Sequence, residues 1–380
     1  MRSLAVVITA MFMVNANYGL SLPLLANNLS RMGASDTLVG LSTAAQALPA
    51  LFLTPFAQRI LAVISPARLM GLCLISASVV LLMFPLLPDP WLWFPLRFLL
   101  GASGNLMWVA GEVWINSLAS EGRRGRTVSI YGIASAGGFA AGPFVLYLTG
   151  TEGWTPFVAG SALVLSAVLT LGLARHVPTD FSSDRPVRVL SLIWLWPVPF
   201  ALNFLFACSI ESLASFFSLM GVRLGLAEAT TFALLSAMGI GSLLMQYPVG
   251  WLADHMDRRK LVVTIVIVVT VATLFLPWVL RSGLWIAYPF IIVYGGFFST
   301  LYALGVVLLG ERFRGGELAA ASAGFTLMWA SGIAIGPPIT GFFYDHFDTP
   351  GLILSVAGFM VIFLIVAPFI WKRRRAASAS

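Results

Sequence analysis

Three ionisable side chains, Arg97, Glu112 and Glu211, lie inside long apolar stretches of the sequence. A charge at the centre of a lipid bilayer costs at least about 2.5 kcal/mol, so each should face a cavity or a partner. Desolvation disfavours the ionised form of a carboxyl group, which makes Glu112 and Glu211 candidate proton carriers. Arg97 could tune such a carboxyl group or bind an anionic group of a substrate. These residues indicate proton-linked chemistry within a membrane.

The composition explains why the apolar stretches are read as membrane-spanning. Of the 380 residues, 59% are hydrophobic and 10% are charged, against roughly 25% charged residues in a soluble domain. This excludes a soluble enzyme, a nucleic-acid-binding protein, a disordered protein and a small disulfide-rich protein. No HExxH, GxSxG or GxxxxGK[ST] motif occurs, and Cys73 and Cys208 fall in apolar runs. We therefore expect a polytopic membrane protein without catalytic residues, cofactor or metal site.

Twelve apolar stretches are each long enough to cross a bilayer as a helix, which needs about 20 residues. They are 4–25, 38–61, 67–87, 91–118, 127–149, 153–174, 192–221, 228–253, 260–281, 284–310, 318–344 and 349–371. The sequence predicts an all-α membrane protein of 12 transmembrane helices in two pseudo-symmetric six-helix bundles. The domains are expected to be an N-terminal bundle (1–174), a cytoplasmic linker (175–191), a C-terminal bundle (192–371) and a basic cytoplasmic tail (372–380).

The basic residues are distributed unevenly between the two sides of the expected membrane. All but four of the 22 Lys and Arg residues lie at the termini or in the even-numbered connections. The four exceptions are Arg31, Arg223 and Arg281 on the other side and Arg97 within a span. The positive-inside rule then places both termini in the cytoplasm, with the chain in a bacterial inner membrane. The net charge of +7 is a topology signal, and we expect no nucleic-acid partner.

One short motif occurs once in each half of the sequence. It consists of Gly138, Gly142 and Pro143 in the first half and of Gly332, Gly336 and Pro337 in the second. Small residues with this spacing allow membrane helices to approach closely. Both copies fall in the fifth expected helix of their half, which favours a parallel internal repeat over a chance match.

The segment GWLADHMDRRK at 250–260 resembles the cytoplasmic signature loop of the major facilitator superfamily. The matching residues are Gly250, Leu252, Asp254, Arg258, and Arg259 or Lys260. The segment differs at Asp257, where the family usually has Gly. The equivalent stretch of the first half, 55–70, lacks the acidic residue, so we expect a single dominant cytoplasmic lock.

In the family this loop latches the cytoplasmic side in the outward-open state, which implies a gating role for Gly250, Asp254, Arg258 and Arg259. We expect Gly250 to permit close helix contact, and Asp254 to pair with Arg258 while accepting hydrogen bonds from a helix N-terminus. The natural partner is the start of the fifth helix near Thr127. The alternative is a solvated loop that only sets the topology.

Two further segments carry the resemblance. RFLLGASG at 97–104 resembles the R-x-x-x-G motif of the fourth helix, and the run at 107–132 is similar to the small bacterial YcaD-like permeases. The resemblance implies a monomeric secondary transporter that works by alternating access on a small-molecule substrate in a lipid bilayer. Two functions stay open. One is proton-coupled efflux of a small organic or amphiphilic solute. The other is proton-coupled uptake of a small metabolite, and an anionic metabolite would suit Arg97.

Helices 1, 4, 7 and 10 line the central cavity in this family, so their polar and aromatic residues form the candidate proton and substrate site. On the fourth helix, the helical period places Asn105, Trp108, Glu112 and Asn116 on one stripe with Arg97 at its outer end. The other candidates are Asn15, Asn17 and Tyr18 of the first helix, Asn203 and Glu211 of the seventh, and Tyr294 of the tenth.

Two expectations about this site depend on geometry. Glu211 lies near the depth of Arg97, so an interaction between the two across the halves is expected. Tyr288 and Tyr302 lie on a different face of the tenth helix from Tyr294, so the three tyrosines cannot all face one cavity. Packing or an interfacial belt is an equal alternative for the aromatic residues, and a structural hydrogen bond is the alternative for Glu112.

Overall fold

The computed structural model describes residues 2–118, 124–171 and 189–377. Within these ranges the side chains of 2–4, 55, 58, 116–118, 124–129, 189, 190, 315, 316, 319 and 371–377 are outside the description. In the described part the chain is helical and contains no strand. Most of the expected linker, at 175–188, and the end of the expected tail, at 378–380, therefore lie outside the described residues.

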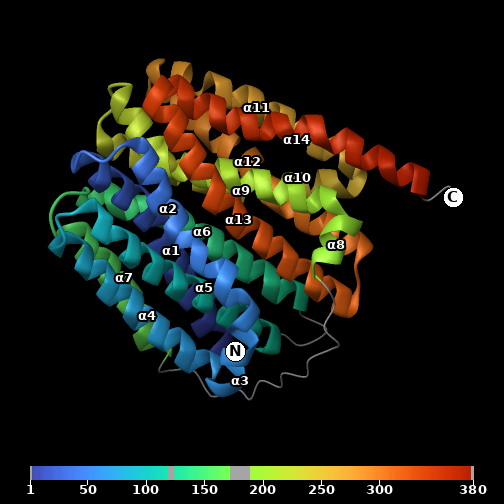
Figure 1. Ribbon diagram of the computed structural model, residues 1–380, viewed down its shortest axis with the longest axis horizontal. Helices are drawn as coiled ribbons and strands as arrows, with labels where there is room; N and C mark the ends of the chain where they lie inside the picture. Colours follow the sequence, from blue (N-terminus) through green and yellow to red (C-terminus); the bar gives the residue numbers. More distant parts are fainter. Residues whose placement is uncertain (1, 119–123, 172–188, 378–380) are drawn as a thin grey trace.

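The helices of the N-terminal half are α1 (Arg2–Arg31), α2 (Asp36–Leu53), α3 (Ala57–Val63), α4 (Pro66–Met83), α5 (Trp93–Leu118), α6 (Arg124–Thr149) and α7 (Thr155–Leu171). Those of the C-terminal half are α8 (Val189–Leu195), α9 (Pro197–Arg223), α10 (Glu228–His255), α11 (Arg258–Arg281), α12 (Leu284–Arg312), α13 (Gly315–Phe347) and α14 (Thr349–Ala377). Short 3₁₀ turns lie at Thr54–Phe56, Phe84–Leu86 and Pro90–Leu92. Figure 1 shows the two sets of helices as neighbouring bundles.

Each predicted span corresponds to one helix or to two consecutive helices. In the described residues, ten helices are long and apolar enough to cross a membrane, and Thr155–Leu171 is a shorter apolar helix. The first span is longer than expected, because α1 continues past residue 25 to Arg31. The last helix also continues, to Ala377, into the segment expected to be a tail.

Two spans that were expected to be single helices are broken. The second is interrupted by the turn at Thr54–Phe56, which has a proline near its start. The seventh is interrupted at Trp196, whose φ of −138° and ψ of 67° are not helical. Pro197 follows Trp196, and a proline sterically disfavours the helical conformation of the residue before it. The breaks divide α2 from α3 and α8 from α9.

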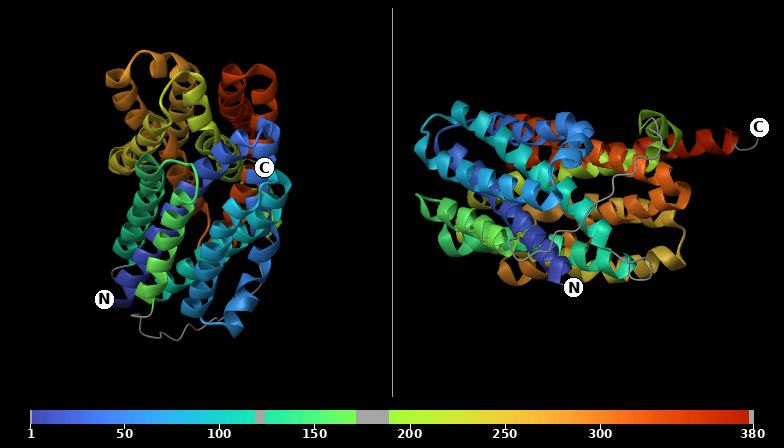
Figure 2. Two further views of the ribbon diagram at one scale, coloured as in Figure 1. Left: turned by 90° about the vertical axis from the view of Figure 1, so that its left-hand side faces the viewer. Right: turned by 90° about the horizontal axis from the view of Figure 1, so that it is seen from below.

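The two halves repeat one packing scheme. In the N-terminal half α1 packs on α6, α2 on α5 and α4 on α7. The C-terminal half repeats these pairs as α9 on α13, α10 on α12 and α11 on α14. The halves meet mainly through α2 with α13 and α6 with α10, and Figure 2 shows these junctions from two further directions. The fold is therefore a pair of pseudo-symmetric bundles.

Glycines set the closest helix pairs at equivalent places in both halves. A Cβ at Gly142 would lie 2.4 Å from the carbonyl oxygen of Ala16, and one at Gly336 would lie 2.4 Å from the Cα of Cys208. The other motif glycines behave alike, because a Cβ at Gly138 would lie 2.2 Å from the Phe12 oxygen. A Cβ at Gly332 would lie 2.5 Å from the Phe204 oxygen. The motif thus lies at the α1–α6 and α9–α13 contacts. Its prolines, Pro143 and Pro337, lie inside α6 and α13.

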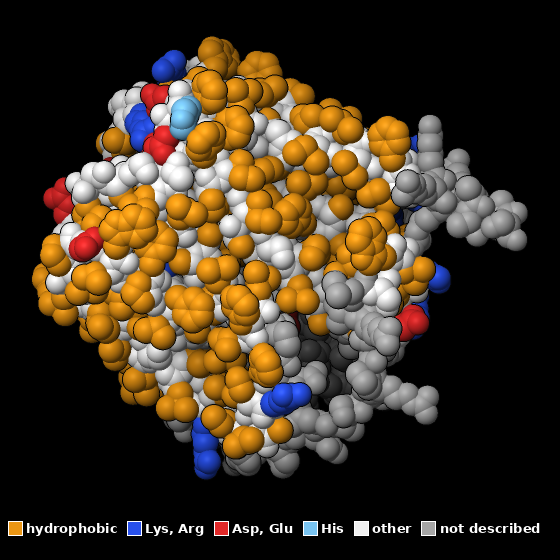
Figure 3. Space-filling view, in the orientation of Figure 1, with side chains coloured by type: hydrophobic (Ala, Val, Ile, Leu, Met, Phe, Trp, Pro, Cys, Tyr) orange, Lys and Arg blue, Asp and Glu red, His pale blue; other side chains and the backbone are white. Residues whose placement is uncertain are grey.

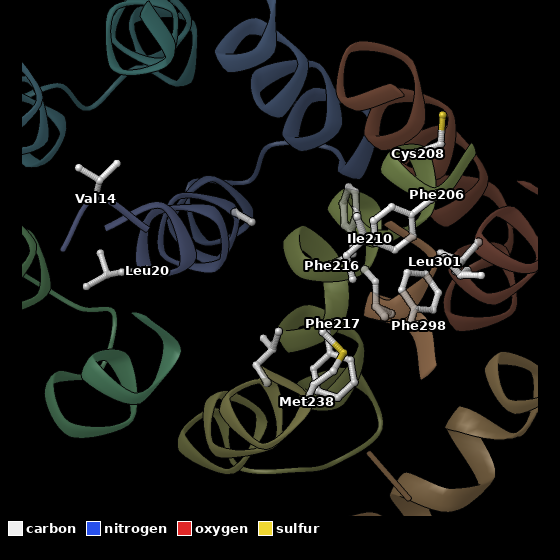
Figure 4. Packing of buried hydrophobic residues seen from close by; sticks show 14 of the residues in the cluster. Val14, Leu20, Phe206, Cys208, Ile210, Phe216, Phe217, Met238, Phe298 and Leu301 are labelled. Carbon is white, nitrogen blue, oxygen red and sulfur yellow. The ribbon is translucent and has the colours of Figure 1, made fainter. Parts of the chain in front are cut away.

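The interior and the outer surface are both apolar. Figure 4 shows Phe206, Phe216 and Phe217 of α9 packed with Met238 and Phe298 of neighbouring helices. Hydrophobic side chains also cover much of the outer face in Figure 3, where charged side chains lie mostly toward the edges. An apolar outer surface of this kind is favourable in contact with lipid and unfavourable in contact with water.

We expect Gly142→Ala to destabilise the protein and Gly132→Ala, in the same helix, to leave it unchanged or more stable. The added methyl group has no room at Gly142, whereas nothing lies within 4 Å of a Cβ at Gly132. Overpacking costs about 1–3 kcal/mol, and an alanine in a helix gains about 1 kcal/mol over glycine. Thermal unfolding of the purified variants in one detergent measures the difference. Equal melting temperatures would contradict the packing role of the motif.

Candidate functional site

The two halves are joined by an ion-pair cluster at one end of the bundle, which we call the Arg223 end. Arg223 of α9 donates to both carboxylate oxygens of Asp36 of α2, at 3.0 and 2.8 Å. Asp345 of α13 accepts the backbone N–H groups of Asp36 at 2.7 Å and of Thr37 at 2.8 Å. The Arg223 guanidinium also lies 4.1 Å from the centre of the Tyr344 ring. The start of α2 is therefore held by two helices of the other half.

A second cluster at the same end joins α1 and the α6–α7 connection to α10. Arg31 of α1 forms an ion pair with Glu228 of α10. Thr151 donates its hydroxyl to the same carboxylate at 2.7 Å. Arg31 and Arg223 are two of the three basic residues that the sequence places on its sparsely charged side. Because basic residues are rare on that side, the sequence indicated that both have a structural role. It did not identify their partners.

Further contacts between the halves run from the Arg223 end toward the middle of the bundle. Asn27 donates to Ser218 at 3.1 Å, and the hydroxyls of Thr43 and Ser215 lie 3.5 Å apart. The deepest is the hydrogen bond from the Tyr18 hydroxyl of α1 to the Glu211 carboxylate of α9, at 3.1 Å. In the described part of the chain, the hydrogen bonds between the halves thus occupy one side of the bundle.

Arg97 of α5 lies beside the deepest contact. It is fully buried, and its Nη1 donates to Oε1 of Gln46 of α2 at 2.8 Å. Its Nε and Nη2 have no hydrogen-bond partner among the described residues. Tyr18 is close enough to Arg97 for the two to interact electrostatically. Arg97, Gln46, Tyr18 and Glu211 thus form a polar chain that crosses from one half to the other.

The expected direct interaction between Arg97 and Glu211 is wrong for this conformation. These two described residues form no ion pair within 4.0 Å, and Tyr18 is the residue that contacts Glu211. The cause is the packing of α5 on α2, where a Cβ at Gly101 would lie 1.8 Å from the carbonyl oxygen of Gln46. This close contact directs the Arg97 side chain to Gln46 and leaves Tyr18 next to Glu211.

A second group of candidate residues gathers nearer the opposite end, which we call the Arg258 end. Nε1 of Trp108 donates to Oε1 of Glu112 at 2.9 Å, and the Trp108 ring centre lies 6.3 Å from that of Tyr131 of α6. Tyr302 of α12 is 39% exposed and lies near Glu112 and Tyr131. The rings of Phe325 and Trp329 of α13 lie 5.4 and 5.5 Å from Tyr302.

We call Trp108, Tyr131, Tyr302, Phe325 and Trp329 the aromatic group. It contains residues of both halves, with Trp108 hydrogen-bonded to Glu112 and with Phe325 and Trp329 against Tyr302. Of the aromatic group, the sequence had singled out Trp108 as a site residue. Helical spacing had separated Tyr302 from Tyr294 without showing which of them faces the other half.

Several residues expected in the cavity lie within one half instead. Asn15 donates to the Met11 carbonyl oxygen of its own helix at 2.8 Å, and the Asn17 Oδ1 atom points toward Gly160 of α7. Asn203 donates to the Phe325 carbonyl oxygen at 2.7 Å, and the Tyr294 hydroxyl bonds to Thr273 at 3.0 Å. In this conformation each of the four side chains contacts its own half, and their assignment to the cavity stays a prediction.

Two other candidates on α5 have different outcomes. Asn105 donates to the Thr54 hydroxyl of the adjacent turn at 3.4 Å, so it faces the end of α2. Asn116 belongs to α5, but its side chain lies outside the described residues. The stripe on α5 is therefore divided, with Arg97 and Asn105 against α2 and with Trp108 and Glu112 toward α6 and the C-terminal half.

Of the contacts expected in the segment 250–260, the ion pair between Asp254 and Arg258 is present. A Cβ at Gly250 would meet no described atom within 4 Å, so the close helix contact expected there is not made in this conformation. Arg258 forms an ion pair with Glu311 of α12 and lies 3.9 Å from Asp254. The side chain of the expected partner, Thr127, lies outside the described residues. The described contacts of Arg258 tie α11 to α12 within one half.

Asp257, the departure from the family pattern, caps α11. Its carboxylate accepts the backbone N–H of Lys260 at 3.0 Å. This hydrogen bond stabilises the charged form and holds the pKa of the carboxyl group below its ordinary value. An aspartate at this position suits a helix N-terminus. The described residues contain no group of three or more His, Cys, Asp or Glu side chains placed to hold a metal ion.

A family model and individual relatives indicate the same protein family. The family model for the Major Facilitator Superfamily matches residues 4–194 and 199–380. The chain is 26% identical over 95% of its length to the uncharacterized MFS-type transporter YfkF of Bacillus subtilis (strain 168), of which it covers 95%. It is 24% identical over 73% of its length to the uncharacterized MFS-type transporter YcaD of Escherichia coli O9:H4 (strain HS), of which it covers 72%.

The fold is similar to that of a solved transporter. A crystal structure of the D323A mutant of the nucleoside transporter NupG superposes with a TM-score of 0.82 at 14% sequence identity. The alignment covers 97% of this chain and 99% of that one. The likeness establishes the arrangement of the helices.

We expect Arg223→Gln to loosen the Arg223 end, because it leaves the buried Asp36 carboxylate without its charge partner. Losing such a partner costs about 1–3 kcal/mol. The fraction of molecules in which the Arg223 end is open should therefore rise at least about five-fold. A cysteine placed at Thr43, which faces Ser215 between the halves, should then be alkylated correspondingly faster. Arg281→Gln, at the same end, is the control. Equal labelling rates in the two variants would show that the ion pairs do not hold this end closed.

Proposed function

Since this chain belongs to the Major Facilitator Superfamily and is a multi-pass membrane transporter of the alternating-access type, we propose that it exports a small organic or amphiphilic solute in exchange for protons. The observation that carries the proposal is the hydrogen bond between Tyr18 and Glu211. It joins the two halves, its acceptor is a titratable group that is 2% exposed, and the donor Tyr18 is half-buried. A proton that binds Glu211 acts directly on the contact that alternating access must break.

The orientation of the chain follows from the same proposal. The excess of basic residues places both termini and the Arg258 end in the cytoplasm, so the Arg223 end faces outward. In this orientation the halves are held together on the outer side, and the aromatic group lies nearer the cytoplasm. The membrane is proposed to be the inner membrane of a bacterium, and the chain is proposed to work as a monomer.

The gating role of the segment 250–260 is part of this proposal. The Arg258–Glu311 pair keeps the loop attached to α12 while the outer side is closed. We propose that Asp254, which is largely exposed, pairs with the start of α6 when the cytoplasmic side closes. The Asp254 carboxylate would then move from solvent to a helix N-terminus, where the helix dipole stabilises a negative charge.

A second candidate function is proton-coupled uptake of an anionic metabolite. The observation that favours it is the buried Arg97, whose Nε and Nη2 atoms have no partner among the described residues. Guanidinium N–H groups of this kind suit a carboxylate or a phosphate. Flux measured in inside-out and right-side-out vesicles separates the two functions by direction.

The transport function is tested with purified protein and reconstituted proteoliposomes. A thermal-shift screen against metabolites and drugs identifies solutes that bind, because a ligand of the folded state raises its stability. Each binding solute is then followed into proteoliposomes with and without an imposed pH gradient. The proposal requires gradient-driven accumulation that an uncoupler abolishes. Accumulation that is equal with and without the gradient would exclude proton coupling.

We expect Glu211→Gln to lose gradient-driven accumulation by at least about ten-fold while it keeps solute exchange across the membrane. A glutamine can still accept the hydrogen bond from Tyr18, so the contact between the halves is retained while the titratable group is removed. Glu152→Gln, which changes a carboxylate that is 84% exposed, is the control. Unchanged pH-driven accumulation in Glu211→Gln would assign the proton to another group.

A further inference from the structure

Glu112 is placed where a ligand between the halves can reach it. Its side chain is half-buried, and its Oε1 atom is fixed by the indole N–H of Trp108 one turn earlier on α5. Tyr131 of the same half and Tyr302 of the other half both lie near it. A carboxylate is therefore presented toward the opposite bundle by a side chain that holds its orientation.

The opposite bundle offers aromatic rings to the same region. Tyr302 is 39% exposed although it lies in the middle of a membrane-spanning helix. Glu112 and Tyr131, which lie near Tyr302, both belong to the other half, so Tyr302 is placed at the junction of the two halves. The Trp329 ring stands at 87° to that of Tyr302 with 5.5 Å between the centres. Because the two rings stand at right angles, a ligand in the corner between them would contact both rings.

We propose that Glu112 and the aromatic group bind an organic cation, with its positive charge near the Glu112 carboxylate and its apolar groups against Tyr302 and Trp329. The inference names the substrate class of the transporter and so rests on the proposed function. A cation is favoured by a carboxylate and by the negative faces of aromatic rings at once. The site needs both halves, because Glu112 comes from α5 and the corner of rings comes from α12 and α13.

An anionic ligand does not fit this position. Arg97 lies 15 residues from Glu112 on the same helix, which separates them by about 22 Å along the axis. The carboxylate of Glu112 would repel an anion bound beside the aromatic group. A neutral aromatic ligand would use the rings and the tyrosine hydroxyls but would gain nothing from the charge of Glu112. The dependence on this charge is therefore the property to test.

The test uses the full-length purified protein in detergent and radiolabelled tetraphenylphosphonium as the probe. Tetraphenylborate has the same shape and the opposite charge, and its binding, measured in separate samples because the two ions precipitate together, separates charge recognition from apolar partitioning. We expect saturable binding of the phosphonium near one per chain and no saturable binding of tetraphenylborate. Non-saturable binding of the phosphonium, or equal saturable binding of both ions, would overturn the proposal.

Four variants locate the site. Glu112→Gln and Tyr302→Ala should each weaken phosphonium binding at least ten-fold. Glu317→Gln removes an exposed carboxylate at the same end, and Tyr247→Ala removes a tyrosine that is 82% exposed on α10. These controls should bind as the unaltered protein does. The melting temperature of each variant shows that it is folded, and wild-type affinity in folded Glu112→Gln and Tyr302→Ala would overturn the assignment.

The outcome is separable from that of the proposed function. If the phosphonium does not bind while another solute accumulates in proteoliposomes with the pH gradient, the organic-cation site is wrong and proton-coupled transport stands. If the phosphonium binds in a Glu112-dependent manner and no solute crosses the membrane, the site is supported and the transport proposal fails.

Discussion

The hydrogen bond between Tyr18 and Glu211 is the contact on which the arrangement of the two halves depends most. It lies deep in an apolar interior, where an unpaired carboxylate or hydroxyl is expensive. The ion pairs of Arg223 and Arg31 lie at the rim, where water and salt weaken them and such pairs contribute about 0–1 kcal/mol. The Asp36 carboxylate is the exception, since it is 6% exposed. Most of the energy that opposes opening at this end therefore resides in buried polar groups, which respond to a proton more strongly than surface pairs do.

The packing between the halves allows them to separate without rearranging either one. A Cβ at Gly40 of α2 would lie 2.2 Å from the carbonyl oxygen of Pro337 of α13, and one at Gly341 would lie 2.2 Å from that of Asp36. Backbones that meet over glycines have few interlocked side chains, so they part with little loss of packing contact. Within each half, the glycines at the α1–α6 and α9–α13 contacts lie in repeated positions. Each bundle can therefore move as a rigid body about the junctions of α2 with α13 and of α6 with α10.

The sequence was sufficient for the fold and only partly sufficient for the site. Apolar length and basic residues gave the twelve spans, and the breaks at Thr54–Phe56 and Trp196 were missed because hydropathy does not register a local turn. A helical wheel gives the angle of Asn17 or Tyr294 about its own helix. It does not say which neighbour occupies that angle, and both side chains turned out to face their own bundle. Tyr18 and Glu211 meet because α1 and α9 are adjacent across the halves, which only the three-dimensional structure shows.

The two buried polar positions of α5 connect the two ends of the molecule. Arg97 lies beside the Tyr18–Glu211 contact, whereas Glu112 lies beside Tyr302 nearer the Arg258 end. α5 and α1 belong to one rigid half, and Glu211 and Tyr302 belong to the other. A rotation that separates Tyr18 from Glu211 must therefore also change the distance between Glu112 and Tyr302. Proton binding at the first contact and ligand binding at the second are then linked by a single movement, and the linkage needs no change in the shape of either half.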